Sequence, residues 1–267
     1  MTTPPSVPSP SATDPARLYW DAQLAGIFQF DELHVRQKLF SVSSTYYLTD
    51  AAQNLLFLAV RPAKLAINIA LGVVASVLRI VVFIYCINLI VYQGRVLEGI
   101  LIIALSNLMI GIPLILLSPY RHIEVFRDES KSWRVLTITQ DNKLGFYRNY
   151  TLYNSWGEPV AVMSRNVFAS LFRRDWWVTY PDGSFLARVR EDSLIRSLLR
   201  RYLGPMYGLL LTNFNLENER GTILGVFDRK LTLTDQYVLK MNGDPQRTLD
   251  RRVCLAMAIL LDTAETR

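Results

Sequence analysis

Residues 65–118 read LAINIALGVVASVLRIVVFIYCINLIVYQGRVLEGILIIALSNLMIGIPLILLS, and this stretch decides the fold. It contains two apolar runs, about 66–92 and 96–117, each long enough to cross the hydrocarbon core of a bilayer, which needs about 20 residues. Only Gln93-Gly94-Arg95 separates the runs, so the two helices must be antiparallel. Both runs are apolar on all sides, which favours membrane-spanning helices over a helix pair buried in a soluble core. The sequence therefore predicts a transmembrane helical hairpin over residues 65–118.

Polar residues inside the hairpin need partners. Arg79 lies at the centre of the first run, where an arginine costs roughly 2.5–3.5 kcal/mol unless it has a partner or a wet cavity. In a hairpin that turns at Gln93-Gly94, we expect Arg79 to lie level with Ser106 and Asn107. These three residues are predicted to form an intramembrane polar group. The group either fixes the register of the hairpin through hydrogen bonds or forms a polar seam for ions, lipid headgroups or a partner subunit.

The residues that flank the hairpin predict its orientation. Arg61 and Lys64 precede the first run, Arg121 and Arg127 follow the second, and the link carries only Arg95. Positive residues in short flanking segments collect on the cytoplasmic side of a membrane. We therefore expect an integral membrane protein with two spans and with its globular part in the cytoplasm.

Outside the hairpin, the sequence is typical of β-structure. Residues 1–16 hold five of the twelve prolines and are expected to form a disordered tail rather than a signal peptide. Residues 17–64 are expected to form a short helix and the first hairpin, and strands return from residue 119 onward. The expected strand pairs are 35–48 with 55–60, 123–127 with 133–139, 150–153 with 160–163, 176–180 with 185–190, and 214–217 with 223–227, with a helical interlude at about 192–203 and a last strand at 231–240.

The C-terminus predicts a buried helix at about residues 250–263. Val253 to Leu261 are nine consecutive apolar residues, which is too short for a membrane span. A short helix that is apolar on every face belongs inside a core. An antiparallel barrel closed around this helix would cover it and would leave no free sheet edges.

Two segments resemble a known family. Val35-Arg36-Gln37-Lys38-Leu39-Phe40-Ser41, followed by Tyr46-Tyr47-Leu48-Thr49-Asp50, is similar to the first hairpin of LURP-one-related proteins, which belong with the phospholipid scramblases and the tubby C-terminal domain. The ending from Asp250-Arg251-Arg252-Val253 to Leu261-Asp262 is similar as well, and the resemblance covers about residues 33–64 and 119–264. It implies a mainly β fold, with a twelve-stranded antiparallel tubby-like barrel around a hydrophobic C-terminal helix.

The chain departs from that family in two ways. The transmembrane hairpin is inserted after the second strand of the family pattern, where typical members carry a soluble connection. The cysteine-rich palmitoylation run and the acidic calcium-binding stretch of the scramblases have no counterpart, because Asn242-Gly243-Asp244-Pro245 is only a turn. The resemblance therefore implies a membrane-associated binding or scaffolding domain rather than a calcium-activated scramblase. Fold analogy alone does not assign a function.

Several chemical classes receive no support from the sequence. The two histidines, His34 and His122, have no neighbours at metal-ligand spacing, and Cys86 and Cys254 lie in separate apolar runs. We therefore expect no metal, no cofactor and no disulfide framework. The formal net charge of +6 suits an anionic membrane surface better than a nucleic acid, which binds denser basic clusters. An enzyme is not expected, although carboxylates at a barrel rim remain an alternative.

Arginines supply the candidate binding residues. We expect a basic face that binds anionic phospholipid, formed by Arg173, Arg174, Arg190, Arg196, Arg200 and Arg201.

The leading hypothesis is a membrane-anchored domain that binds lipid or a protein partner without catalysis, and the hairpin could also join a partner or a second copy. The alternative is scramblase-like lipid translocation along a polar groove at Arg79. Trp176 and Trp177 are either a membrane-interface belt or, as adjacent strand residues, one core ring and one outward ring.

Overall fold

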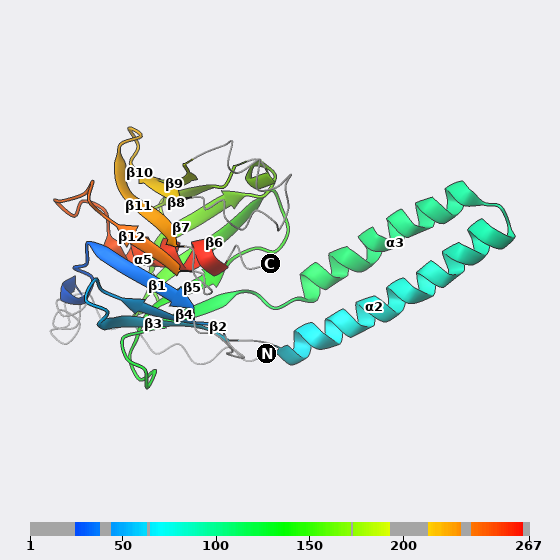
Figure 1. Cartoon of the computed structure of the whole chain (residues 1–267), viewed down its shortest axis with the longest axis horizontal. Helices are drawn as coiled ribbons and strands as arrows, with labels where there is room; N and C mark the ends of the chain where they lie inside the picture. Colours follow the sequence, from blue (N-terminus) through cyan, green and yellow to red (C-terminus); the bar gives the residue numbers. More distant parts are fainter. Residues whose placement is uncertain are drawn as a thin grey trace. The chain divides into compact units, whose positions relative to one another are not determined.

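The structure is a computed structural model of the 267-residue chain, and it describes residues 25–37, 44–62, 65–171, 173–192, 213–230 and 236–263. The chain forms two compact units (Figure 1). The barrel unit comprises residues 1–62, 122–141 and 146–267, and the helical unit comprises residues 63–121 and 142–145. The short loop 142–145 therefore belongs to the helical unit, although the sequence assigned it to the barrel.

The barrel unit is a closed ring of twelve strands in which every neighbouring pair is antiparallel. The four predicted pairs from residue 123 onward are present. Residues 35–48 were predicted to pair as one strand with 55–60, but they belong to two strands that pair with each other, β1 (Glu32–Gln37) and β2 (Ser44–Thr49), and only β2 pairs with β3 (Leu55–Arg61). Strand β1 closes the ring by pairing with β12 (Gln236–Lys240), where Leu33 lies opposite Leu239. The strands are β1 (Glu32–Gln37), β2 (Ser44–Thr49), β3 (Leu55–Arg61), β4 (His122–Phe126), β5 (Arg134–Gln140), β6 (Tyr147–Asn154), β7 (Pro159–Asn166), β8 (Asp175–Thr179), β9 (Phe185–Glu191), β10 (Phe214–Glu217), β11 (Ile223–Lys230) and β12 (Gln236–Lys240).

Alternation along the strands separates the core from the surface. In β8, the side chain of Trp176 is 1% exposed and that of Trp177 is 43% exposed. Successive side chains of a strand point to opposite faces, so one ring packs inside and the other lies outside. The alternative of one core ring and one outward ring is therefore confirmed.

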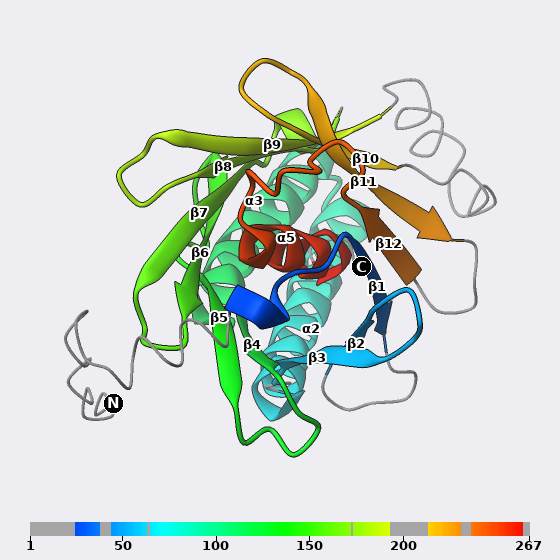
Figure 2. The ribbon, with the colours of Figure 1, turned by 90° about the vertical axis from the view of Figure 1, so that its left-hand side faces the viewer.

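Helix α5 (Arg251–Thr263) contains the apolar run Val253–Leu261, and this run is buried on every face. Val253 to Leu261 are each at most 1% exposed. The helix contacts β1 and β12 and also β7, which lies on the opposite side of the ring. Figure 2 shows α5 framed by the strands. The predicted helix at about 250–263 is thus present, and its burial accounts for an apolar run too short for a span.

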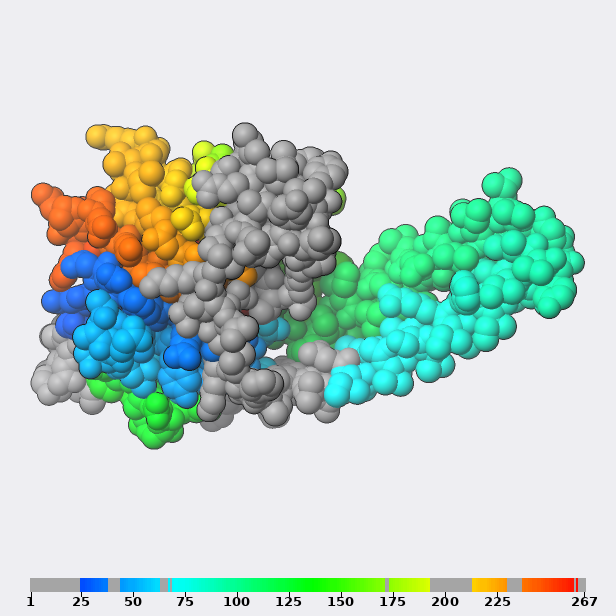
Figure 3. Space-filling view, viewed as in Figure 1, coloured from blue at the N-terminus to red at the C-terminus, as the bar shows by residue number. Residues whose placement is uncertain are grey.

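The helical unit contains α2 (Leu65–Ile87), the π-helical turn η1 (Asn88–Tyr92) and α3 (Val96–Leu117). The two helices pack against each other (Figure 3). Ala75, Cys86 and Leu89 are buried in this unit. Gly99 permits the close approach, because a Cβ atom there would lie 2.5 Å from Cγ1 of Ile90. Both helices are long and apolar enough to span a membrane.

Strand direction gives the barrel two distinct ends. Because the strands alternate in direction, the chain leaves β3 and enters β4 at the same end, and both connections lead to the helical unit. We call this the hairpin end, and it also carries the β5–β6, β7–β8 and β9–β10 connections. The opposite end, called the pocket end, carries the β2–β3, β4–β5, β6–β7, β8–β9 and β10–β11 turns and the connection from β12 to α5.

Candidate functional site

Three of the predicted lipid-binding arginines gather at the hairpin end. Arg173 and Arg174 immediately precede β8, and Arg190 lies near the end of β9. Strand pairing brings them together, because Asp175 lies directly opposite Arg190. Arg173, Arg174 and Arg190 thus lie near one another, together with acidic residues that the sequence did not indicate.

Glu191 anchors the first two arginines. Its side chain is fully buried, and the backbone N–H of Arg174 donates to its Oε2 atom at 3.0 Å. The guanidinium group of Arg174 lies 3.8 Å from Oε1 of the same carboxylate. Arg173 Nε donates to the backbone carbonyl of Glu191 at 3.0 Å. These contacts fix both arginines at the rim of the barrel.

Asp175 holds the other side of this cluster. Arg188 Nε donates to Asp175 Oδ1 at 2.8 Å, and Arg190 Nε lies 3.9 Å from Oδ2. The hydrogen bond to Asp175 raises the pKa of Arg188, whereas burial, followed by the positive charge of Arg190, lowers the pKa of Arg173. Glu217 in β10 lies opposite Arg188 and adds a third carboxylate, so four guanidinium groups face three carboxylates and the cluster keeps one excess positive charge.

The remaining lipid-binding candidates, Arg196, Arg200 and Arg201, lie outside the described residues, as does the predicted helical interlude around them. Their place along the chain is still informative. They follow β9, which ends at Glu191, and precede β10, so both ends of their segment attach at the hairpin end. The described candidates Arg173, Arg174 and Arg190 therefore lie at the barrel end where the segment with the other three begins and ends.

The predicted contact between the two spans is not formed. Ser106 Oγ and Asn107 Nδ2 each donate to the carbonyl oxygen of Ile103, one turn back in their own helix, at 2.9 Å. Arg79 is exposed and has no hydrogen bond or ion pair with any residue that the structure describes. Short polar side chains in a helix reach their own backbone at less entropic cost than a neighbouring helix, which explains the difference.

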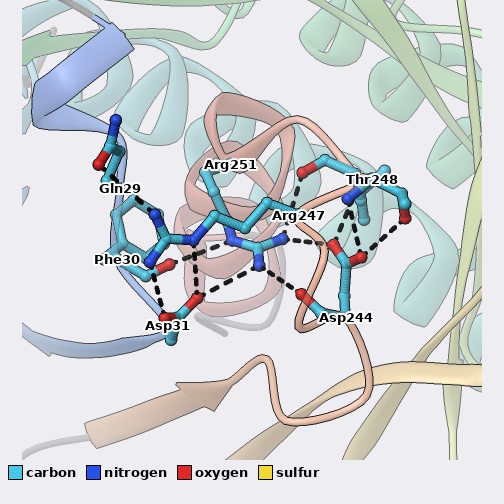
Figure 4. Close-up of polar contacts among 8 residues, drawn as sticks. Gln29, Phe30, Asp31, Asp244, Arg247, Thr248 and Arg251 are labelled. Carbon is cyan, nitrogen blue, oxygen red and sulfur yellow. Dashed lines mark hydrogen bonds and ion pairs between the residues drawn. The ribbon is translucent and has the colours of Figure 1, made fainter.

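The pocket end contains a buried ion-pair network that the sequence reasoning missed. Figure 4 shows the guanidinium group of Arg251 between Asp31 and Asp244. Arg251 Nη1 donates to Asp244 Oδ2 at 2.7 Å, and Nε donates to the carbonyl of Phe30 at 3.1 Å. Arg251 and Asp244 are only 4% and 2% exposed. This network ties the start of α5 to the segment before β1.

The turn before α5 contains a close backbone contact at Gly243 and the buried carboxylate of Asp244. A Cβ atom on Gly243 would lie 2.1 Å from the carbonyl oxygen of Ile223, so only glycine fits there. The next residue, Asp244, accepts hydrogen bonds from Arg251 and from the backbone N–H groups of Thr248 and Leu249. Burial alone would raise the pKa of Asp244, but these hydrogen bonds outweigh it and lower the pKa. Residues 242–245 thus form a turn, as predicted, and Asp244 in this turn also holds Arg251.

A pocket of about 770 Å³ opens beside this network, and its lining includes Phe28, Glu158, Asp250 and Arg252. Both carboxylates are already engaged as acceptors. Asn154 Nδ2 donates to Glu158 Oε2 at 2.9 Å, and Arg252 Nε donates to Asp250 Oδ2 at 2.9 Å. The carboxylates that line this pocket are thus held by neighbouring side chains.

The histidines and cysteines serve the fold. His34 Nε2 lies 2.8 Å from a carboxylate oxygen of Glu32, two residues away on the same strand. Both cysteines are buried and unpaired, and burial raises the pKa of the Cys254 thiol to about 12.

Comparisons of the chain with protein families, curated proteins and solved structures found no match. The functional argument therefore depends on the geometry of the two barrel ends.

Proposed function

We propose that this chain is a membrane-anchored domain at the cytoplasmic face that binds anionic lipid, or a protein partner, without catalysis. In this proposal α2 and α3 cross the bilayer, and the barrel is a tubby-like fold closed around α5, related to the LURP-one-related and scramblase-like proteins. The hairpin end faces the lipid headgroups.

One observation carries the proposal. Both connections to the helical unit, the cluster of Arg173, Arg174 and Arg190, and the segment bearing Arg196, Arg200 and Arg201 all attach to the same barrel end. A chain that leaves this end to enter a bilayer keeps those arginines near the headgroups. Each basic residue near an anionic surface contributes about 1 kcal/mol within a Debye length of about 8 Å, and tethering by two spans raises their effective concentration.

Lipid retention by the full chain tests the proposal. The protein is purified from micelles that contain equal amounts of neutral and anionic phospholipid, and the lipid that stays bound is quantified by mass spectrometry. We expect enrichment of the anionic lipid, a loss of enrichment at high salt, and a several-fold loss when Arg196, Arg200 and Arg201 become Ala. Arg220→Ala is the matched control, because Arg220 is an exposed arginine in the β10–β11 turn at the pocket end.

Two results would contradict lipid binding. Equal retention of neutral and anionic lipid would remove the electrostatic basis of the proposal. An equal effect of Arg220→Ala would mean that net charge, rather than the hairpin end, controls retention. Either result would favour a protein partner as the occupant of that end.

Lipid translocation is the second candidate, and Arg79 favours it. An exposed arginine in the middle of a span attracts lipid phosphate and water into the bilayer. Vesicles that contain the full chain and a fluorescent phospholipid separate the two functions. Binding leaves the inner-leaflet lipid protected from an added quencher, whereas translocation exposes it, and Arg79→Leu should then abolish the exposure.

A further inference from the structure

Three exposed aromatic side chains lie at the hairpin end of the barrel, and two of them are in contact. Phe146, Tyr147 and Phe168 are 69%, 52% and 58% exposed, and we call them the aromatic patch. The ring centroids of Phe146 and Phe168 lie 5.5 Å apart, and the backbone N–H of Val167 donates to the carbonyl of Phe146 at 2.8 Å. The start of β6 and the segment after β7 are therefore fixed together, and both rings face away from the core.

This concentration of exposed aromatic surface is unusual within the barrel unit. Six large apolar or aromatic side chains are exposed among its described residues, and the patch holds three of them. Of the others, Trp177 packs edge-on against Phe185 and lies under the guanidinium group of Arg188. Scattered exposed apolar residues are normal, but clustered ones indicate an interaction surface.

The chain connects this patch directly to the end of a predicted span. In the helical unit, Lys143 Nζ donates to the carbonyl oxygen of Leu116 at 2.6 Å and lies 4.2 Å from the ring centroid of Tyr120. Leu116 is the second-last residue of α3, so loop 142–145 lies where that helix ends. Phe146 follows Gly145 across one peptide bond.

The charges around the patch fit the same location. Lys143 precedes the patch and is its basic neighbour in the chain. Arg148 and Arg165, which lie opposite each other in β6 and β7, share the strand face of the core residues Tyr150 and Met163, and the Arg165 guanidinium lies 5.1 Å from the centroid of the buried Trp176 ring. Aromatic rings with basic neighbours are typical of the membrane–water interface, where the rings enter the acyl boundary and the cations remain among the headgroups. No acidic residue occurs from Asn142 to Arg148, so nothing in that segment repels an anionic surface.

We propose that the aromatic patch inserts into the interfacial layer of the same bilayer that α2 and α3 cross. The patch then acts as a third, apolar anchor that sets the orientation of the barrel on the membrane. This inference rests on the proposed insertion of the helical hairpin. It differs from the lipid binding proposed above because the contact is apolar and does not depend on lipid charge.

Depth-dependent quenching in the full chain tests the inference. Phe168→Cys is labelled with a polarity-sensitive fluorophore and reconstituted into neutral phosphatidylcholine vesicles with or without a lipid that carries a shallow spin label. Ile223→Cys is the matched control, since Ile223 is 46% exposed but lies at the pocket end. The two native cysteines are buried, so the wild-type chain should show little labelling.

We expect the probe at position 168 to emit at shorter wavelength and to be quenched several-fold more strongly than the probe at position 223. High salt should not change this difference, whereas it should weaken the contacts of the arginine cluster. A label at Phe146→Cys provides a second position in case the first label disturbs the patch. Equal, weak quenching at both ends would overturn the inference and would indicate a protein partner for the patch.

Failure of the hairpin to insert is detected separately. Vesicle flotation after extraction at alkaline pH reports whether the chain is integral, independently of the probe. A chain that floats while the probe at position 168 stays unquenched contradicts only the aromatic anchor. A chain that does not float contradicts the proposed function itself, and the anchor with it.

Discussion

At the scale of single residues, the buried pair of Arg251 and Asp244 dominates the pocket end. Removing one partner of a buried ion pair leaves a bare charge and typically costs about 3–5 kcal/mol. Asp244→Asn should therefore lower the free energy of unfolding by about that amount, measured by urea titration of tryptophan fluorescence. Asp31→Asn is the control, because the Asp31 carboxylate is 58% exposed and should cost about 1 kcal/mol or less. Similar costs for both variants would contradict the central role of Asp244.

The same residues predict an acid-labile barrel. Hydrogen bonds lower the pKa of Asp244 despite its burial, and the hydrogen bond from Arg247 lowers the pKa of Asp31. A carboxylate with a lowered pKa in the folded state stabilises the fold above its unfolded pKa, and this stabilisation is lost as the pH falls through the folded pKa. The urea midpoint should therefore be steady near neutral pH and fall below about pH 4. In Asp244→Asn this acid-induced fall should be smaller, and an unchanged profile would argue against the network.

At the scale of elements, α5 should carry much of the stability of the barrel. Leu255 is fully buried, and replacing a buried leucine by alanine costs about 2–5 kcal/mol. We expect Leu255→Ala to lower the free energy of unfolding by that amount in the full chain. Ile223→Ala, at an exposed position, should have little effect. A barrel that unfolds at the parent urea midpoint after Leu255→Ala would show that α5 is dispensable.

The first span offers a second test at this scale. Arg79 has no partner among the described residues, so its cost in the bilayer is not offset within the part of the chain that the structure describes. Arg79→Leu should improve insertion of α2 in a microsomal assay by up to about 3 kcal/mol. Arg95→Leu is the control, because Arg95 lies in the link and pairs with Glu98. Weaker insertion of Arg79→Leu would indicate that Arg79 binds a partner during assembly.

The elements were more predictable than the contacts between them. Pro181-Asp182-Gly183 marks its hairpin because proline and glycine favour turn positions, and the β8–β9 pair follows from local residues alone. A closed barrel was expected from the buried helix and the family resemblance. The strand pair that closes it could not be predicted from local residues, because Leu33 pairs with Leu239 far along the chain. The burial of Glu191 was missed since a charged residue at a strand end normally faces water. The burial of Glu191 depends on a tertiary contact, in which the backbone N–H of Arg174 donates to the Glu191 carboxylate.

At the scale of the whole molecule, the two ends of the barrel have different roles. The pocket end holds the start of α5 through the buried ion pair of Arg251 and Asp244, so these two charges stabilise the fold. The hairpin end combines a positive excess at the arginine cluster with the aromatic patch, and both connections to the helical unit leave from it. In the proposed function, the pocket end has a structural role and the hairpin end faces the membrane.

This separation predicts the topology of the full chain. The flanks of the hairpin carry Arg61 and Arg121, so the barrel should lie in the cytoplasm and the link between α2 and α3 on the other side. A membrane-impermeant maleimide should therefore label Gln93→Cys in intact spheroplasts and should label Glu219→Cys only after permeabilisation. Both positions are exposed, and the native Cys86 and Cys254 are buried, which keeps the background low. Labelling of Glu219→Cys in sealed cells would reverse the orientation, and the arginine cluster would then face the outer leaflet, where anionic lipid is scarce.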